Sequence, residues 1–346
     1  MIRILIVEDS VTQREILHKV LESDNEFAVV GEARDGSRAV EMVKEHQPDV
    51  VLMDVHMPKM DGIEATRQIM SQCPVPIVIV SATLQKRDID HGLAALEAGA
   101  VSIVQKPKGA ALLHLKKIGP ELRDAILAAS QANVRRIHDP TRTKTRPKIP
   151  NRKSQTTVEV VGICASTGGP PVLVEILSSL PDANPIPILL VQHISEPFAE
   201  GFATWLAGRT GQPVRIASND QRLEPGVWLA PPGHHLTLGS RRRIKLDPKT
   251  STDIHCPSGN PLFASLARHL GADAVGVQLT GMGDDGAKGL LELKQAGGQT
   301  LIQNEASCMI YGMPKAAKKL GAAGHETSPG EIAVILSQIA RRRLAQ

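Results

Sequence analysis

The feature that most constrains the fold is a regular alternation of short apolar runs with segments of helical periodicity. In residues 1–127 each apolar run is four to six residues long, a length typical of buried strands. Five such runs separated by helical segments predict a doubly wound parallel sheet. The runs are Ile2–Val7, Phe27–Gly31, Val50–Asp54, Ile77–Ser81 and Ser102–Gln105, and a last helix is expected near Ala111–Ala129.

The alternation is broken once, by residues 131–155, which lack periodicity. This stretch combines Pro, Thr and Gln with eight Lys or Arg and one acid, Asp139, whereas the whole chain has a formal net charge of +4. The basicity is therefore local and is typical of a solvated, flexible linker, with a nucleic-acid patch as the alternative. We expect domains at 1–127 and 157–346, joined by a basic linker at 128–156.

At about Val158 the alternation resumes, with strands expected near 158–163, 187–192 and 275–280. Between them, residues 212–246 form short apolar segments punctuated by Gly and Pro. This pattern predicts an antiparallel insertion or hairpin. The second half is therefore expected to be another α/β domain, mostly parallel and doubly wound.

Composition narrows the class of protein. Aromatic residues make up only 2% of the chain, so its cores must rest on Val, Ile, Leu and Ala. The N-terminus does not have the pattern of a signal peptide, and no apolar segment is long enough to span a bilayer, so no membrane insertion is expected. Four cysteines without CxxC spacing indicate reduced thiols in a cytoplasmic protein: Cys73, Cys164, Cys256 and Cys308.

Charged residues follow the predicted strands of the first half. Glu8 and Asp9 end the first strand, Asp54 the third and Ser81 the fourth, and Lys106 follows the fifth. The carboxyl ends of parallel strands share one edge of the sheet, where ligands bind. Clustered carboxylates need a cation, and hard oxygen ligands suit Mg²⁺. The hydroxyl and the lysine are suited to binding phosphoryl oxygens.

These residues make the first half resemble a two-component receiver domain over nearly all of residues 1–127. The resemblance implies that Asp54 accepts phosphate from a phosphohistidine on a sensor kinase. It also implies that Asp9, Asp54 and the backbone carbonyl of His56 bind Mg²⁺, with Glu8 assisting. Lys106 and Ser81 would then contact the phosphoryl group.

Two positions depart from the receiver pattern. Glu8 stands where an aspartate is common, which favours a metal contact through water. Ile103 replaces an aromatic residue often used as a switch. The His56 side chain is given no role, because it is expected to be a solvent-exposed loop residue.

In the second half, the stretch "VEVVGICASTGGPPVLVEIL" at residues 158–177 predicts a strand, a glycine turn and a helix. Ser166 lies on the turn and is interpreted in two ways, as a helix N-cap or as an exposed nucleophile. A phosphate cradle is disfavoured, because neither GxxxxGK[ST] nor GxGxxG is present.

Two further strand ends carry groups that would serve a nucleophilic serine. His193 ends the strand in "IPILLVQHIS", and Asp284 and Asp285 lie in the glycine turn "LTGMGDDGAKG". A hydroxyl, an imidazole and a carboxylate at one edge can act as nucleophile, general base and orienting group. The glycines leave backbone N–H groups free for an oxyanion hole.

Other assignments compete with this one. His234 and His235 in "APPGHHLTL" are alternative bases, and His255 is expected in a polar surface loop. The order Ser, His, Asp and the absence of GxSxG disfavour an α/β-hydrolase. The absence of HExxH disfavours metal hydrolysis.

The motifs "GICASTGGP", "VQHISEPF" and "LTGMGDDGAKG" together resemble the catalytic domain of chemotaxis protein-glutamate methylesterases, the CheB family, over about Val158–Ser337. With the receiver and the linker, the resemblance covers almost the whole chain. It implies a catalytic triad of Ser166, His193 and Asp285. Asp285 is preferred to Asp284 because the family's aspartate directly precedes "GA".

The resemblance also implies that the Met282 N–H helps to bind the oxyanion, that Thr167 lies at the cleft, and that the hydrolase site needs no cofactor. The expected function is phosphorylation-regulated hydrolysis of glutamate methyl esters on cytoplasmic chemoreceptor helices, with deamidation of glutamines. A chemotaxis histidine kinase would be the phosphodonor, and no DNA is bound. Three alternatives stay open: a DNA-binding output, a non-catalytic binding module, and a hydrolase of another ester or amide.

Overall fold

The computed structural model describes residues 1–22, 25–81, 86–106, 112–134 and 157–345. The chain divides into two compact units, Met1–Pro140 and Thr141–Gln346. Most of the linker expected at 128–156 lies outside the described residues, so its bounds stay a prediction. Among the described helices, none has both the length and the apolar composition needed to cross a bilayer.

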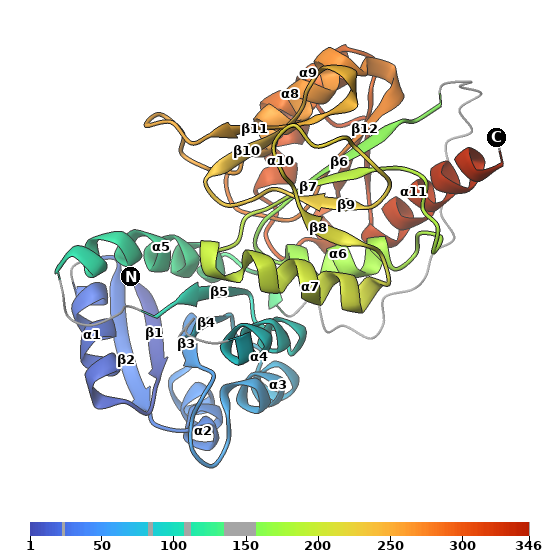
Figure 1. Ribbon diagram of the computed structural model, residues 1–346. Coiled ribbons are helices and arrows are strands. Elements are labelled where there is room, and N and C mark those ends of the chain that lie inside the picture. The colour runs from blue at the N-terminus through green and yellow to red at the C-terminus, as the bar shows by residue number, and fades with distance from the viewer. Residues whose placement is uncertain (23–24, 82–85, 107–111, 135–156, 346) are drawn as a thin grey trace. The chain divides into compact units, whose positions relative to one another are not determined.

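The first unit is a five-stranded parallel sheet in the order β2-β1-β3-β4-β5, as the sequence predicts. Helices α1 and α5 pack together on one face, and α2, α3 and α4 lie on the other (Figure 1). The strands are β1 Ile2–Val7, β2 Phe27–Ala33, β3 Val50–Asp54, β4 Ile77–Ser81 and β5 Ser102–Gln105. The helices are α1 Val11–Glu22, α2 Gly36–His46, α3 Gly62–Gln72, α4 Lys86–Glu97 and α5 Leu112–Ser130.

Every residue of β3 and β4 is buried, because helices cover both faces of this sheet. Strand β1 lies between β2 and β3, so the chain changes direction across the sheet at β1. A crevice forms at such a switch point, outside the carboxyl ends of the strands. Glu8 and Asp9 follow β1 directly and Asp54 ends β3, so the topology brings these three acids to that crevice.

The second unit is built on a seven-stranded parallel sheet in the order β14-β13-β12-β6-β7-β9-β8. Helices α6, α7 and α11 cover one face and α8, α9 and α10 the other (Figure 1). The strands are β6 Val160–Ala165, β7 Ile188–Gln192, β8 Val214–Ile216, β9 Val227–Leu229, β12 Ala274–Gln278, β13 Gln299–Gln303 and β14 His325–Thr327. The helices are α6 Gly169–Leu177, α7 Ala199–Thr210, α8 Gly259–His269, α9 Ala287–Gln295, α10 Met313–Lys319 and α11 Pro329–Leu344.

The region 212–246 is only partly antiparallel. Strands β10 His234–Leu238 and β11 Ile244–Pro248 form the expected antiparallel hairpin. Strands β8 and β9, in contrast, pair in parallel with each other, and β9 pairs with β7. Each of these strands is only three residues long, which is too short to show an alternation of apolar and polar residues. The sequence therefore could not indicate whether they pair in parallel or antiparallel. Strands β13 and β14 were not predicted.

This sheet also has a switch point. Strand β6 lies between β7, the next strand in the chain, and β12, which comes much later. Residues Ala165 and Gln192 pair in register, so Ser166 and His193 follow at adjacent strand ends. On the other side Cys164 pairs with Gln278, which places the loop after β12 beside the same crevice.

Helices α8 and α9 approach each other closely at Gly289. A Cβ atom at this position would clash with the backbone carbonyl of Asn260. By contrast, a Cβ at the exposed Gly208 in α7 would meet no atom within 4 Å. One helical glycine is thus required by packing, and the other is not.

We predict that Gly289→Ala lowers the free energy of unfolding of the second unit by about 1–3 kcal/mol, because the obstructing atoms are backbone. Gly208→Ala should raise it by up to about 1 kcal/mol, since alanine favours the helix. Trp205 and Trp228, the two tryptophans of the chain, both lie in this unit, so urea denaturation followed by fluorescence measures both effects. An equal change in the free energy of unfolding for both substitutions would contradict the close contact of α8 and α9 at Gly289.

Candidate functional sites

The acidic side chains of the first unit gather as predicted. Oxygen atoms of Glu8, Asp9 and Asp54 all lie within 4.8 Å of one another. Glu8 and Asp54 are buried, whereas Asp9 is exposed. The Lys106 Nζ lies 2.7 Å from a Glu8 oxygen and 2.8 Å from Asp54 Oδ1. The sheet edge therefore holds two buried carboxylates, one exposed carboxylate and one cation.

Burial dominates the electrostatics of this cluster. Burial and then the charge of Asp54 raise the pKa of Glu8, and burial raises the pKa of Asp54 despite its pairing with Lys106. Burial alone would lower the pKa of Lys106, but the charges and hydrogen bonds of Asp54 and Glu8 raise it. One lysine thus does not fully compensate the burial of the two carboxylates in their ionised form, and this hard oxygen donor set fits Mg²⁺.

Ser81 and His56 lie near this edge, and both contact α4. The buried Ser81 hydroxyl donates to the backbone carbonyl of Asp88, with an oxygen–oxygen distance of 3.5 Å. The His56 side chain is exposed, as expected, but its Nε2 lies 3.1 Å from Asp88 Oδ1 and its ring packs against His91. The loop after β3 is therefore tied to α4, a contact that the sequence did not indicate.

Arg14 also contributes to this edge of the sheet, and the sequence motifs did not indicate it. Its guanidinium is buried and donates to the backbone carbonyls of Glu8 and Asp9, at 2.6 and 3.0 Å. Its Nε donates to Glu32 at 3.1 Å. Arg14 therefore fixes the turn that carries the two acids. Ile103, which stands at the position of the expected switch, is buried within β5.

In the second unit, Ser166 follows β6 on the glycine turn and is partly exposed. Its interpretation as a helix N-cap is wrong: Gly168, at a positive φ of 77°, is the N-cap of α6, and no side chain caps this helix. Among the residues that the structure describes, none forms a hydrogen bond with the Ser166 hydroxyl. That hydroxyl is therefore available for chemistry.

His193 and Asp285 are joined directly. The His193 Nε2 lies 2.9 Å from Asp285 Oδ2. The Asp285 side chain is 2% exposed, and that of His193 is 18% exposed. An ionised carboxylate only accepts hydrogen bonds, so the imidazole donates from Nε2 and its Nδ1 is left as the ring nitrogen that can take a proton.

Asp285 is stabilised in its ionised form. Burial alone would raise its pKa, but hydrogen bonds from His193, Ser258 and the Gly259 N–H, with the charge of His193, lower the pKa well below its usual value. The Ser258 hydroxyl donates to Oδ1, and the Gly259 N–H donates to Oδ2 at 2.7 Å. The Asn260 amide donates to Oδ1 at 3.2 Å.

The sequence motifs did not indicate this segment, Ser258–Asn260, or two further neighbours of the site. The buried Gln192 amide donates to the backbone carbonyls of Ser166 and His193, at 3.0 and 2.9 Å. The His255 ring stacks on His193 with a centroid distance of 5.1 Å and an interplanar angle of 13°. The one available signal was "CPSGNP", in which serine and glycine begin a helix, and that signal indicates a cap and no catalytic role.

The expected oxyanion groups lie beside Ser166. A Cβ atom on Gly281, the residue before Met282, would clash with the Ser166 Cβ. Within the described part of the chain, the Met282 N–H has no hydrogen-bond acceptor. The Thr167 carbonyl accepts from the buried Thr280 hydroxyl at 3.1 Å, which fixes the glycine turn against the loop after β12.

The residues considered as alternatives to His193 and Asp285 do not join this hydrogen-bonded pair. Asp284 is exposed. His234 is also exposed, and its Nδ1 contacts the Pro232 carbonyl. The buried His235 pairs with Asp253, with an Nε2–Oδ2 distance of 3.2 Å. These contacts leave His193 as the histidine that the structure joins to Asp285.

Cys164, His193 and Asp285 also form a group with metal-ligand atoms within 4.8 Å of one another. Burial, followed by the charge of Asp285, raises the pKa of the Cys164 thiol well above its usual value. Metal ligation requires the thiolate. Asp285 Oδ2 moreover already accepts from His193 and Gly259. This donor set fits a hydrogen-bonded carboxylate better than a metal centre.

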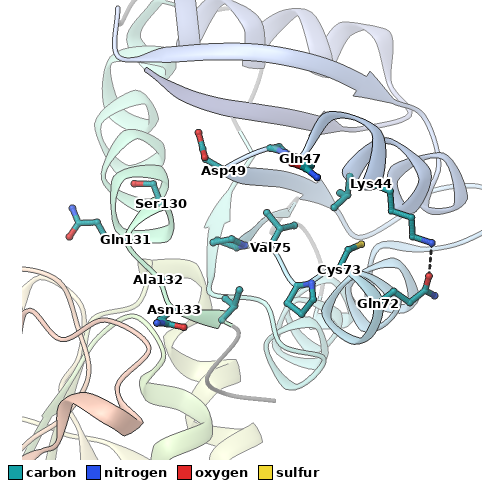
Figure 2. Close-up of a pocket in the computed structure, with 15 residues that line it drawn as sticks. Lys44, Gln47, Asp49, Gln72, Cys73, Val75, Ser130, Gln131, Ala132 and Asn133 are labelled. Atoms are coloured by element: carbon teal, nitrogen blue, oxygen red, sulfur yellow. Dashed lines mark hydrogen bonds between the residues drawn. The ribbon is translucent and has the colours of Figure 1, made fainter. Parts of the chain in front are cut away.

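A pocket of about 840 Å³ lies at the opposite edge of the first sheet (Figure 2). Its lining includes Asp49, which precedes β3, Val75, which precedes β4, and Lys44, whose Nζ donates to Gln72. It is therefore at the amino ends of the strands, away from the acidic cluster at their carboxyl ends.

Comparison with known proteins gives consistent matches over both units. A model of the CheB methylesterase family matches residues 161–336, and a model of the response regulator receiver domain matches residues 4–116. Protein-glutamate methylesterase/protein-glutamine glutaminase 4 of Myxococcus xanthus is 43% identical over 318 residues, which cover 90% of each chain. Protein-glutamate methylesterase/protein-glutamine glutaminase 2 of Methanospirillum hungatei is 38% identical over an alignment of 353 positions, which covers 99% of each chain.

Among solved structures, the crystal structure of the Thermotoga maritima CheB methylesterase catalytic domain matches with a TM-score of 0.51 and 30% sequence identity. The match covers 53% of this chain and all of that one.

We predict that Asp285→Asn lowers the free energy of unfolding of the second unit by about 1–3 kcal/mol at neutral pH, because charged hydrogen bonds are lost. The pKa of Asp285 is depressed in the folded state, so its stabilising contribution is complete above the unfolded pKa of about 3.9. That contribution disappears as the pH falls toward the folded value. Urea denaturation at several pH values should therefore show a gap between wild type and variant that narrows below about pH 4.

The control is Asp284→Asn, because Asp284 is the exposed neighbour of Asp285. This variant should unfold like the wild type at every pH. A gap for Asp285→Asn that stays constant into the acid range would contradict the ionised, hydrogen-bonded state of Asp285.

Proposed function

The chain belongs to the CheB methylesterase family and carries a receiver domain, and we propose that it hydrolyses glutamate methyl esters on chemoreceptors under the control of phosphorylation at Asp54. The observation that carries the proposal is the buried His193–Asp285 hydrogen bond beside the partly exposed Ser166. Deamidation of receptor glutamines would follow the same chemistry, because an amide differs from an ester only in its leaving group.

In the proposed mechanism, Ser166 Oγ attacks the γ-carbonyl carbon of the methylated glutamate and its proton passes to His193 Nδ1. Asp285 holds the imidazole and stabilises the imidazolium that forms. The Met282 N–H donates to the oxygen that becomes negatively charged. When the tetrahedral intermediate collapses, His193 returns the proton to the leaving methoxide, and methanol departs.

The acyl-enzyme is then hydrolysed by the same groups. A water molecule gives its proton to His193 and attacks the acyl carbon. Ser166 leaves with that proton, and the carboxylic acid that remains on the receptor releases its own proton to solvent, which gives the glutamate carboxylate. The Gln192 amide, which bonds the carbonyls of both Ser166 and His193, keeps the nucleophile and the base at a fixed separation through both steps.

For the first unit we propose that Asp54 accepts a phosphoryl group from a histidine kinase. Glu8, Asp9, Asp54 and the His56 carbonyl would hold Mg²⁺, which when bound offsets the negative charge of these groups and of the phosphate. Lys106 and Ser81 would contact phosphoryl oxygens. Phosphorylation would then raise the esterase rate by shifting the population of the chain toward an active form.

The nucleophile is tested by Ser166→Ala, assayed as methanol release from methylated receptor. We expect kcat to fall by about 10⁵–10⁶-fold, because the nucleophile of a triad is lost. Phosphorylation of Asp54 should be unchanged, and an unchanged urea denaturation curve from tryptophan fluorescence would show that the second unit is folded. Methanol release at the wild-type rate would exclude Ser166 as the nucleophile.

The phosphoacceptor is tested by Asp54→Asn with acetyl phosphate as the phosphodonor. We expect no phosphorylated protein by mass spectrometry and no activation of methanol release, since the amide cannot accept the phosphoryl group. EDTA should stop phosphorylation of the wild type by removing Mg²⁺. The matched control is Asp49→Asn, at the opposite edge of the sheet, which should behave as wild type. Activation that persists in Asp54→Asn would place the acceptor elsewhere.

A further inference from the structure

The Asp285 carboxylate has further partners besides His193, and three of them come from one turn. Oδ1 accepts from the Ser258 hydroxyl and from Asn260 Nδ2, and Oδ2 accepts from the Gly259 N–H. These three residues form the start of α8, with Ser258 as its N-cap. With His193 Nε2 and the Cys164 thiol, whose Sγ lies 3.8 Å from Oδ2, five donors therefore surround a side chain that is only 2% exposed.

The donors decide the charge of Asp285. A buried carboxyl group without partners takes up a proton, because a low dielectric disfavours the charged form. Here burial is opposed by the hydrogen bonds, and the pKa of Asp285 ends well below its usual value. The N-terminus of α8 adds its positive dipole at the same point. The carboxylate thus remains an acceptor for His193 Nε2.

The donors also decide its position. The Ser258 hydroxyl accepts from the Asn260 N–H at 3.2 Å while it donates to Asp285, so the same group caps α8 and holds the carboxylate. Asn260 Oδ1 accepts from the Gly289 N–H of α9 at 3.0 Å, while its Nδ2 donates to Asp285. The close contact of α8 and α9 therefore fixes Asp285 through Asn260.

We propose that Ser258 and Asn260 are positioning residues of the hydrolase site: they keep Asp285 ionised and oriented, so that His193 presents Nδ1 to Ser166. The proposal rests on the catalytic roles given above to these three residues, but it does not depend on which ester is hydrolysed. Neither residue touches the reacting atoms. Both act through the carboxylate.

The two substitutions are chosen to leave the helix intact. Asn260→Asp keeps the shape and the acceptor for the Gly289 N–H, but it replaces the donor facing Asp285 by a second carboxylate. An acid at this position also favours the start of a helix. Ser258→Gly removes the hydroxyl, yet glycine is tolerated at an N-cap with a loss of only a few tenths of a kcal/mol.

The test uses the full-length chain and two readouts. The first is the rate at which a fluorophosphonate labels Ser166, which reports activation of the nucleophile. We expect both variants to label about 10–100-fold more slowly, the effect of losing a hydrogen bond to a charged group. The second is the pKa of the Asp285 carboxyl, from ¹³C NMR of selectively labelled aspartate. We expect it to rise in both variants.

Rescue and control complete the design. Ser258→Thr retains a hydroxyl and should restore both readouts toward wild type. Ser328→Gly makes the same substitution at the N-cap of α11 and should leave both unchanged. Wild-type labelling rates in Asn260→Asp and Ser258→Gly would overturn the proposal, as would slower labelling with an unaltered Asp285 titration.

The test of Ser258 and Asn260 can fail or succeed independently of the test of the proposed methylesterase activity. If Ser166 is labelled but methylated receptor releases no methanol, the proposed substrate is wrong and the positioning role stands or falls on the two readouts. If wild-type Ser166 is not labelled at all, the Asp285 titration still decides whether Ser258 and Asn260 hold the carboxylate ionised.

Discussion

The hydrogen bond between His193 Nε2 and the buried Asp285 carboxylate is the interaction on which the catalytic half of the molecule depends. It requires that Asp285 stay charged where water does not reach it, and the turn at the start of α8 meets this requirement. The bond settles which nitrogen of His193 is free. Ser166 follows the neighbouring strand and does not cap its helix, and in the proposed mechanism His193 is its base.

The two halves of the chain hold their functional groups at equivalent positions of the fold, but the surroundings of their buried carboxylates differ. Both put their functional groups at the carboxyl edge of a parallel sheet, where strand order reverses. In the first half, burial raises the pKa of Glu8 and Asp54, and a lysine offsets only part of their charge. In the second, neutral donors saturate Asp285. The first arrangement suits a cation and a phosphoryl group, and the second suits a fixed imidazole.

Much of this architecture follows from the sequence. The βα alternation predicts both parallel sheets, and four of the five strands of the first unit have the predicted bounds. The clustering of Glu8, Asp9 and Asp54, and the meeting of His193 with Asp285, follow because strand ends of a parallel sheet share an edge.

Other features could not be predicted, because they depend on contacts between distant segments. Ser258 and Asn260 look like an ordinary helix start, and only the packing of α8 against the loop after β12 brings them to Asp285. The amide of Gln192 and the stacking of His255 are of the same kind. The parallel direction of β8 and β9 was missed because three residues carry no pattern.

The tautomer of His193 tests most directly whether Asp285 orients this imidazole. ¹⁵N NMR of labelled histidine in the full-length chain, at a pH where the ring is neutral, distinguishes a proton on Nε2 from one on Nδ1. We expect the proton on Nε2, donated to Asp285, and an unprotonated Nδ1. A proton resident on Nδ1 would contradict this orientation, because His193 could not then accept the proton of Ser166 at that nitrogen.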